Sequence, residues 1–83
     1  VRSDRPVIFP NPARNMVHVQ WPTVPDEHLS YLIMDATGRL MRRDVGALRN
    51  SSLDVPLEDL APGAYWLVVN AEIGHLTLPF VKE

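Results

Sequence analysis

The chain has 83 residues, of which 46% are hydrophobic and 22% are charged, and it contains no cysteine. A chain of this length buries roughly 60–65% of the surface that its unfolded form exposes, which leaves room for one modest core and not for two. The formal net charge of −2 provides no basic surface and argues against nucleic acid as a partner. Without cysteine, thiolate metal sites and thiol nucleophiles are excluded.

Membrane-spanning and targeting segments are also missing from the sequence. Its apolar runs are far shorter than the ~20 residues that a membrane-spanning helix needs. No secretory signal or transit peptide opens the chain, although Val1 is not an initiator methionine and a fragment of a longer protein would look the same. The lack of disulfide-forming residues favours the cytosol only weakly, so the compartment stays open at this point.

Apolar and polar residues alternate along the first half of the chain, with the period of an extended strand. Four strands are predicted here, at residues 7–9, 16–21, 29–35 and 40–45. The second strand places Val17, Val19 and Trp21 on one face. The third strand is apolar on both faces near its middle, which predicts a central position in a sheet. A polar loop with two prolines runs between these two strands, from Trp21 to His28.

Three more strands are predicted in the second half: around Leu53 and Val55, from Ala64 to Asn70, and from Leu76 to Lys82. The segment Pro56–Pro62 crosses between strands, with one helical turn predicted at residues 57–60. Seven short strands with regular turn signals predict an all-β fold, a seven-stranded immunoglobulin-like β-sandwich. The paired cysteines of true immunoglobulin domains are missing, so the prediction concerns architecture alone. Residues 1–6 are predicted to end a linker, and residues 7–83 to form one domain.

The tetrapeptide Phe9-Pro10-Asn11-Pro12 follows the first predicted strand. Each proline fixes its own φ and drives the residue before it toward an extended conformation, so the segment is stiff and cannot be helical. The Asn11 side chain is expected to bond to nearby backbone and to close a turn. Taken alone, the motif indicates a strand end with a rigid exit.

Two further turns are indicated by their residue types. Asp35-Ala36-Thr37-Gly38-Arg39 suits a type I turn followed by a bulge, because glycine tolerates a positive φ. Pro62-Gly63 supplies a sharp turn into the next strand. There Tyr65 is expected to bury its ring while its hydroxyl bonds to backbone, as in a tyrosine corner. Asp35 has no second carboxylate near it in sequence, so a structural role is favoured over catalysis or metal binding.

The remaining polar residues form no catalytic or metal-binding pattern. His18, His28 and His75 lack metal-ligand spacing, and a zinc site needs three or four converging donors. The serines lack a Gly-x-Ser-x-Gly elbow. Arg42-Arg43 lies on a predicted edge strand, where charge commonly blocks unwanted strand pairing. The sequence therefore predicts no enzyme, no cofactor and no metal.

The order and spacing of the motifs carry more information than any single motif. The full series is Phe9-Pro10-Asn11-Pro12, an alternating strand, Asp35-x-x-Gly38-Arg39, Leu60-x-Pro62-Gly63-x-Tyr65 with an apolar strand, and a closing Phe80-Val81-Lys82. This series resembles the C-terminal sorting domain, type A, of cargo proteins of the type IX secretion system. The resemblance covers about Val7 to Glu83, which is nearly the whole chain.

The resemblance implies a domain at the C-terminus of proteins that reach the periplasm by the general secretory route. The type IX translocon of the outer membrane recognises such a domain and exports the attached N-terminal cargo. A surface sortase of the cysteine-protease class usually then cuts upstream of the domain, and the cargo is released or joined to anionic lipopolysaccharide. In some members the domain is kept and mediates docking at the cell surface. The family fold is a seven-stranded immunoglobulin-like sandwich, in agreement with the strand count from periodicity.

On the same resemblance, the signal residues are those that match the family's motifs. They are Pro10, Asn11 and Pro12 in the opening motif, Gly38 and Arg39 in the middle motif, Gly63 and Tyr65 in the Gly-x-Tyr motif, and Phe80, Val81 and Lys82 in the terminal strand important for export. Where the family often has a lysine shortly before the terminal apolar pair, this chain has Leu78-Pro79. A proline donates no backbone hydrogen bond, so Pro79 predicts an edge strand or a bulge.

A translocon that exports folded cargo has to recognise a surface rather than thread an extended peptide. An edge strand is well suited, because strand addition supplies main-chain hydrogen bonds and alternate side-chain pockets supply specificity. The hypothesis is that the strand Leu76–Lys82 and its rim form the recognition surface. The same edge would allow an edge-paired or strand-swapped dimer.

Two other functions remain open on the sequence. An immunoglobulin-like accessory module of a secreted enzyme would bind carbohydrate or protein through aromatic side chains on an accessible face, with Trp21 and Trp66 as candidates. The alternative for both tryptophans is packing inside the sandwich or at its ends. A purely structural spacer is the other rival function.

Overall fold

The computed structural model describes residues 6–21, 28–71 and 74–83. It contains seven strands: β1 (Val7–Phe9), β2 (Met16–Gln20), β3 (His28–Asp35), β4 (Leu40–Ala47), β5 (Ser52–Pro56), β6 (Gly63–Ala71) and β7 (Gly74–Lys82). All seven predicted strands are confirmed, with ends that differ by at most two residues. In the described part of the chain, no helix is long and apolar enough to cross a membrane.

Some predictions fall on segments outside the described residues. These are the linker at residues 1–6 apart from Pro6, most of the loop at residues 21–28, and the centre of the turn between β6 and β7. The helical turn predicted at residues 57–60 is instead an isolated turn between β5 and β6. In it the Leu60 N–H donates to the Leu57 carbonyl at 3.0 Å, and the chain continues into β6 without another helical bond.

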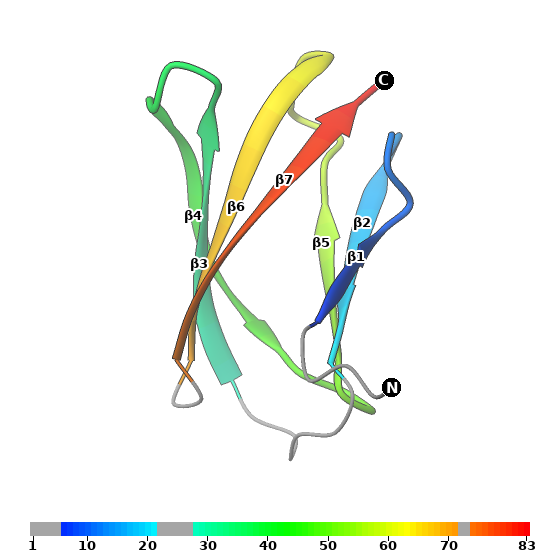
Figure 1. The fold of residues 1–83 in the computed structure, drawn as a ribbon, viewed down its shortest axis with the longest axis vertical. Helices are drawn as coiled ribbons and strands as arrows, with labels where there is room; N and C mark the ends of the chain where they lie inside the picture. Colours follow the sequence, from blue (N-terminus) through cyan, green and yellow to red (C-terminus); the bar gives the residue numbers. More distant parts are fainter. Residues whose placement is uncertain (1–5, 22–27, 72–73) are drawn as a thin grey trace, which may run out of the picture.

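The strands form two antiparallel sheets, with strand orders β1-β2-β5 and β4-β3-β6-β7 (Figure 1). Strand β3 pairs with β4 on one side and β6 on the other, so its predicted central position is confirmed. Strands β4 and β5 approach one another, which closes one side of the two layers. Strands β1 and β7 are therefore the edge strands of the opposite side.

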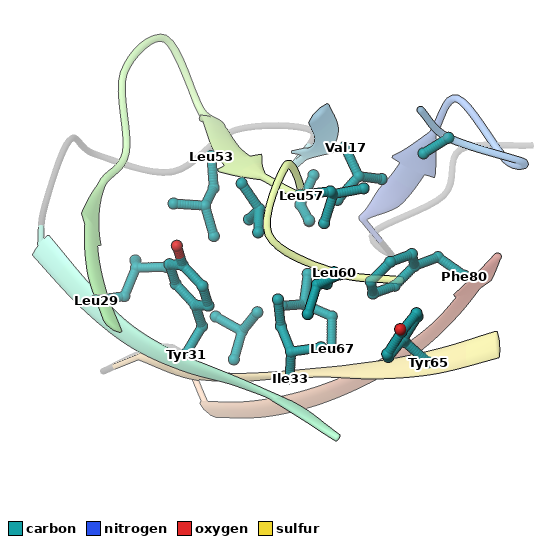
Figure 2. Packing of buried hydrophobic residues seen from close by; sticks show 14 of the residues in the cluster. Val17, Leu29, Tyr31, Ile33, Leu53, Leu57, Leu60, Tyr65, Leu67 and Phe80 are labelled. Carbon is teal, nitrogen blue, oxygen red and sulfur yellow. The ribbon is translucent and has the colours of Figure 1, made fainter. Parts of the chain in front are cut away.

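The core lies between the two sheets, where inward-facing side chains from both layers meet (Figure 2). Alternation along each strand accounts for it, because every second residue faces the other sheet. Val17 and Val19 of β2 are fully buried, as the period-two pattern predicts. The other buried members are Ala13, Trp21, Leu29, Tyr31, Ile33, Leu48, Leu53, Val55, Leu57, Leu60, Tyr65, Leu67, Val69 and Phe80.

The two tryptophans have different environments. Trp21 is 5% exposed and belongs to the core, whereas Trp66 is 40% exposed on the outer face of the four-stranded sheet. Packing inside is therefore the right interpretation for Trp21 and the wrong one for Trp66. The cause is the alternation of β6, in which Tyr65 and Leu67 take the inward positions on either side of Trp66.

The arginine pair on β4 is also divided between two environments. Strand β4 is an edge strand, as predicted, and Arg43 is exposed. Arg42 instead turns toward the crossover between β5 and β6, where its Nη1 lies 2.7 Å from Asp59 Oδ1 and its Nη2 donates to the Pro56 carbonyl. Its side chain is only 18% exposed. Arg42 therefore connects the two sheets and does not act as an exposed charge that blocks strand pairing at the edge.

Candidate recognition surface

The Phe9-Pro10-Asn11-Pro12 segment connects β1 to β2 and reaches the end of the chain. The Asn11 Oδ1 accepts a hydrogen bond from the Val81 N–H of β7 at 2.9 Å. The prediction that Asn11 closes a local turn is therefore wrong, because its side-chain partner is 70 residues away. The motif ties the first strand of one sheet to the last strand of the other.

Ala13 extends the same connection. Its N–H donates to the Val81 carbonyl and its own carbonyl accepts from the Glu83 N–H, each at 2.7 Å. Ala13 has no exposed surface and forms a parallel bridge with Lys82. At this point the loop acts as a one-residue strand on the outer edge of β7. An exposed pair between Arg14 Nε and Glu83 Oε1, at 3.2 Å, lies beside it and contributes little.

Strands β6 and β7 bring the Gly-x-Tyr motif beside the terminal motif. Gly63 pairs with Lys82, and Tyr65 pairs with Phe80. The rings of Tyr65 and Phe80 stack, with their centroids 5.6 Å apart. The Tyr65 hydroxyl donates to the Ala61 carbonyl at 2.5 Å, so the predicted bond from this hydroxyl to backbone is confirmed. The Lys82 Nζ donates to the Leu60 carbonyl at 2.6 Å, which fixes the end of β7 to the turn before β6.

The turn between β3 and β4 is built around one carboxylate. Asp35 Oδ1 accepts from the Thr37 N–H at 3.0 Å, the Thr37 hydroxyl at 2.6 Å and the Arg39 N–H at 2.9 Å. The hydrogen bonds from Thr37 and Arg39 hold the pKa of the Asp35 carboxyl below its usual value. Gly38 has a φ of +89°, as its predicted turn position requires. Asp35 therefore has a structural role in this turn, in which Thr37 and Arg39 supply its hydrogen-bond donors.

These four motif regions lie at the same end of the molecule. Asp35 pairs with Tyr65 across β3 and β6, and Tyr65 pairs with Phe80 across β6 and β7. Figure 1 shows the β3–β4 turn, the start of β6, the end of β7 and the β1–β2 connection together at the upper end. The ten predicted signal residues are thus brought to one end of the fold. Tyr65 and Phe80 are buried there, whereas Val81 is 43% exposed.

The hydrogen bonds of Val81 show which way the backbone of β7 points. Its N–H and carbonyl both point away from β6, toward Asn11 and Ala13. Backbone groups in a strand alternate in direction, so the N–H and carbonyl of Thr77 and the carbonyl of Pro79 also point to the outer edge. Strand β7 pairs with β6 without a register shift, and the predicted edge position of Pro79 is confirmed. Its missing N–H costs no hydrogen bond within the sheet.

The outer face of the four-stranded sheet carries a row of apolar side chains. Met34, Trp66 and Pro79 form one row across β3, β6 and β7, and Leu40 of β4 pairs with Met34 at the end of that row. Antiparallel sheets usually place polar residues on the solvent face, and this apolar row departs from that pattern. The sequence signal for this row is the apolar run of β6, because consecutive apolar residues in a strand lie on both faces of the sheet.

Among residues 6–21, 28–71 and 74–83, no three His, Asp or Glu side chains gather in a way that could hold a metal ion. His18 Nδ1 and Asp54 Oδ1 lie 2.7 Å apart, on the exposed face of the three-stranded sheet. The ring of Phe9 lies beside His18, with centroids 5.4 Å apart.

The chain is similar in structure to PorZ, described as an essential bacterial surface component of the type IX secretion system of Porphyromonas gingivalis. The TM-score is 0.58 at 20% sequence identity, and the likeness covers 94% of this chain and 11% of that one. The chain thus spans about a tenth of the PorZ chain, and the likeness concerns the fold. No curated protein matches the sequence. The family described as the secretion system C-terminal sorting domain matches residues 7–83, and the chain therefore belongs to this family of sorting domains of type IX secretion.

Proposed function

We propose that the type IX translocon recognises this domain through strand β7 and the end of the fold where the four motif regions lie, and so exports the cargo attached before residue 7. The observation that carries the proposal is that all four motif regions lie at the same end of the fold, the end at which β7 finishes. They reach that end from both sheets and from separate parts of the sequence. A surface that exists only after folding suits a translocon that selects folded cargo.

The route follows from the same proposal. The cargo crosses the inner membrane by the general secretory route, folds in the periplasm and leaves through the outer membrane to the cell surface or the medium. A surface sortase then cuts upstream of the domain, or the domain is retained for surface docking. The domain itself has no catalytic activity and acts as a signal.

We also propose that the architecture is an immunoglobulin-like sandwich. A three-stranded sheet facing a four-stranded one, with all pairs antiparallel, supports it. The hydroxyl of Tyr65, bonded to backbone four residues upstream, also supports it, because a tyrosine at this corner is a recurrent feature of such folds. An isolated domain would use the edge of β7 for an edge-paired or strand-swapped dimer, which sedimentation at increasing concentration would detect.

The proposed signal function is tested with a tagged cargo fused to residues 1–83 and expressed in a cell that has the type IX translocon. Removing the residues after Ile73 deletes β7 and the partners of Asn11 and Ala13. The truncated fusion is expected to stay in the periplasm while the complete fusion reaches the surface. Surface export of the truncated fusion at the normal level would refute the proposal.

A carbohydrate- or protein-binding accessory module is the second candidate, and the exposed Trp66 favours it. A flat aromatic ring flanked by Met34 and Pro79 offers a stacking surface for a sugar ring. A glycan array separates the two functions, because a sorting domain is expected to give no signal on it. Binding of a defined glycan that is lost in Trp66→Ala would favour the accessory module.

A further inference from the structure

One side of the two-layer fold is less completely closed than the other. Strands β1 and β7 form this side, opposite the approach of β4 and β5. Ile8 of β1 and Leu76 and Leu78 of β7 pack against the core while remaining partly exposed. Apolar side chains that are incompletely covered therefore lie at this side, below the point where Ala13 bridges to β7.

The main chain of β7 has unused hydrogen-bonding capacity at the same side. Val81 and Glu83 are occupied by Asn11 and Ala13. Thr77 presents a donor and an acceptor outward and Pro79 an acceptor, and within the described residues no partner meets them. Exposed backbone of this kind is a template for another strand.

Ala13 shows that this edge accepts an additional strand, since it pairs with β7 through two main-chain bonds. On its core side, a strand continuing along the edge from Ala13 would meet apolar side chains. Leu76 and Leu78 face it there, whereas His75, Thr77 and Pro79 lie on the outer side. Apolar residues at alternate positions of the added strand would cover the two leucines.

We propose that the protein that recognises this domain contributes an extended strand, apolar on the face toward the core, which pairs with β7 between His75 and Pro79. The inference rests on the proposed sorting function and adds the chemistry of the partner. The paired segment is about 17 Å long, which is the length of an ordinary strand. The bridge at Ala13 sets its upper limit, because beyond it the edge of β7 is already occupied.

Thr77→Pro tests the proposal, because it removes an outward N–H that β6 does not use. The matched control Thr77→Ala alters the side chain and keeps the donor. Both are placed in the tagged fusion, and the thermal unfolding of each isolated domain is recorded. Thr77→Pro is expected to lower surface export at least about fivefold, the factor that corresponds to one main-chain hydrogen bond. Thr77→Ala is expected to be exported normally.

The outcomes separate the partner strand from the sorting function. Normal export of a folded Thr77→Pro fusion would overturn strand addition and leave the sorting function in place. Retention of the unmodified fusion would overturn the sorting function itself. If Thr77→Pro unfolds, Leu76→Lys decides, because a charge pointing inward at an edge blocks strand pairing. Export of folded Leu76→Lys at the level of its control Leu76→Met would likewise overturn the proposal.

Discussion

Asp35 belongs to the motif of the β3–β4 turn, and the hydrogen bonds of that turn shift its pKa. Its carboxylate accepts three hydrogen bonds in the β3–β4 turn, and these bonds lower its pKa from 3.8. A carboxyl whose pKa is lower in the folded than in the unfolded state stabilises the fold above the unfolded pKa. That stabilisation is lost as the pH falls through the folded pKa.

Asp35→Asn is therefore expected to lower the free energy of unfolding near neutral pH and to have a progressively smaller effect below pH 3.8. Urea unfolding of both proteins between pH 7 and pH 2.5 measures the difference. Thr37→Ala is the matched variant, since it removes the hydrogen-bond donor with the largest effect on this pKa while keeping the carboxylate. A difference between Asp35→Asn and the unmodified domain that is constant with pH would contradict this account.

Arg42 and Arg43 are neighbours in sequence that are expected to contribute very different amounts to stability. Arg42 bonds to Asp59 and the Pro56 carbonyl, and its aliphatic stem packs where the two sheets meet. Because Asp59 is largely exposed, most of the stabilisation comes from the carbonyl bond and the packing. Arg42→Ala is expected to lower the free energy of unfolding by about 2 kcal/mol, and Arg43→Ala by less than about 0.5 kcal/mol. Equal losses in urea unfolding would refute the structural role of Arg42.

At the scale of elements, the local patterns were predictable and the contacts between distant elements were not. The inward positions of Val17 and Val19 follow from alternation alone. The partner of Asn11 does not, because strand pairing across 70 residues leaves no local signal. A register shift between Ile33 and Met34 likewise inverts the alternation of β4, so that Arg42 lies opposite an inward residue.

The backbone of β7 is expected to give an alternating pattern of amide hydrogen exchange. Leu78 and Phe80 direct their N–H groups toward β6 and should exchange slowly. Thr77 directs its N–H to the open edge and should exchange fast, whereas Val81 should be protected by Asn11. Exchange followed by NMR at single residues measures all four, and Asn11→Ala should speed exchange at Val81 by about fivefold. Slow exchange at Thr77 in the isolated domain would mean that the edge is already paired.

At the scale of the whole molecule, the signal residues divide into those that build the fold and those that the partner can touch. Phe80 is fully buried and stacks on Tyr65, so its effect on export must pass through folding. Val81, its neighbour, is 43% exposed on the outer face. A domain of this size has a free energy of unfolding of about 5–10 kcal/mol, so the loss of one large core side chain removes much of it.

Phe80→Ala is accordingly expected to lower the free energy of unfolding by about 3–5 kcal/mol and to abolish export together with the folded state. Val81→Ala is expected to change stability by less than about 1 kcal/mol, so any loss of export would report direct contact. Urea unfolding and the surface-export assay, applied to both variants, separate the two effects. A Phe80→Ala domain that stays folded at the assay temperature yet fails to reach the surface would mean that the translocon reads this ring directly. Recognition would then require the end of β7 to open, because the ring is covered in the folded domain.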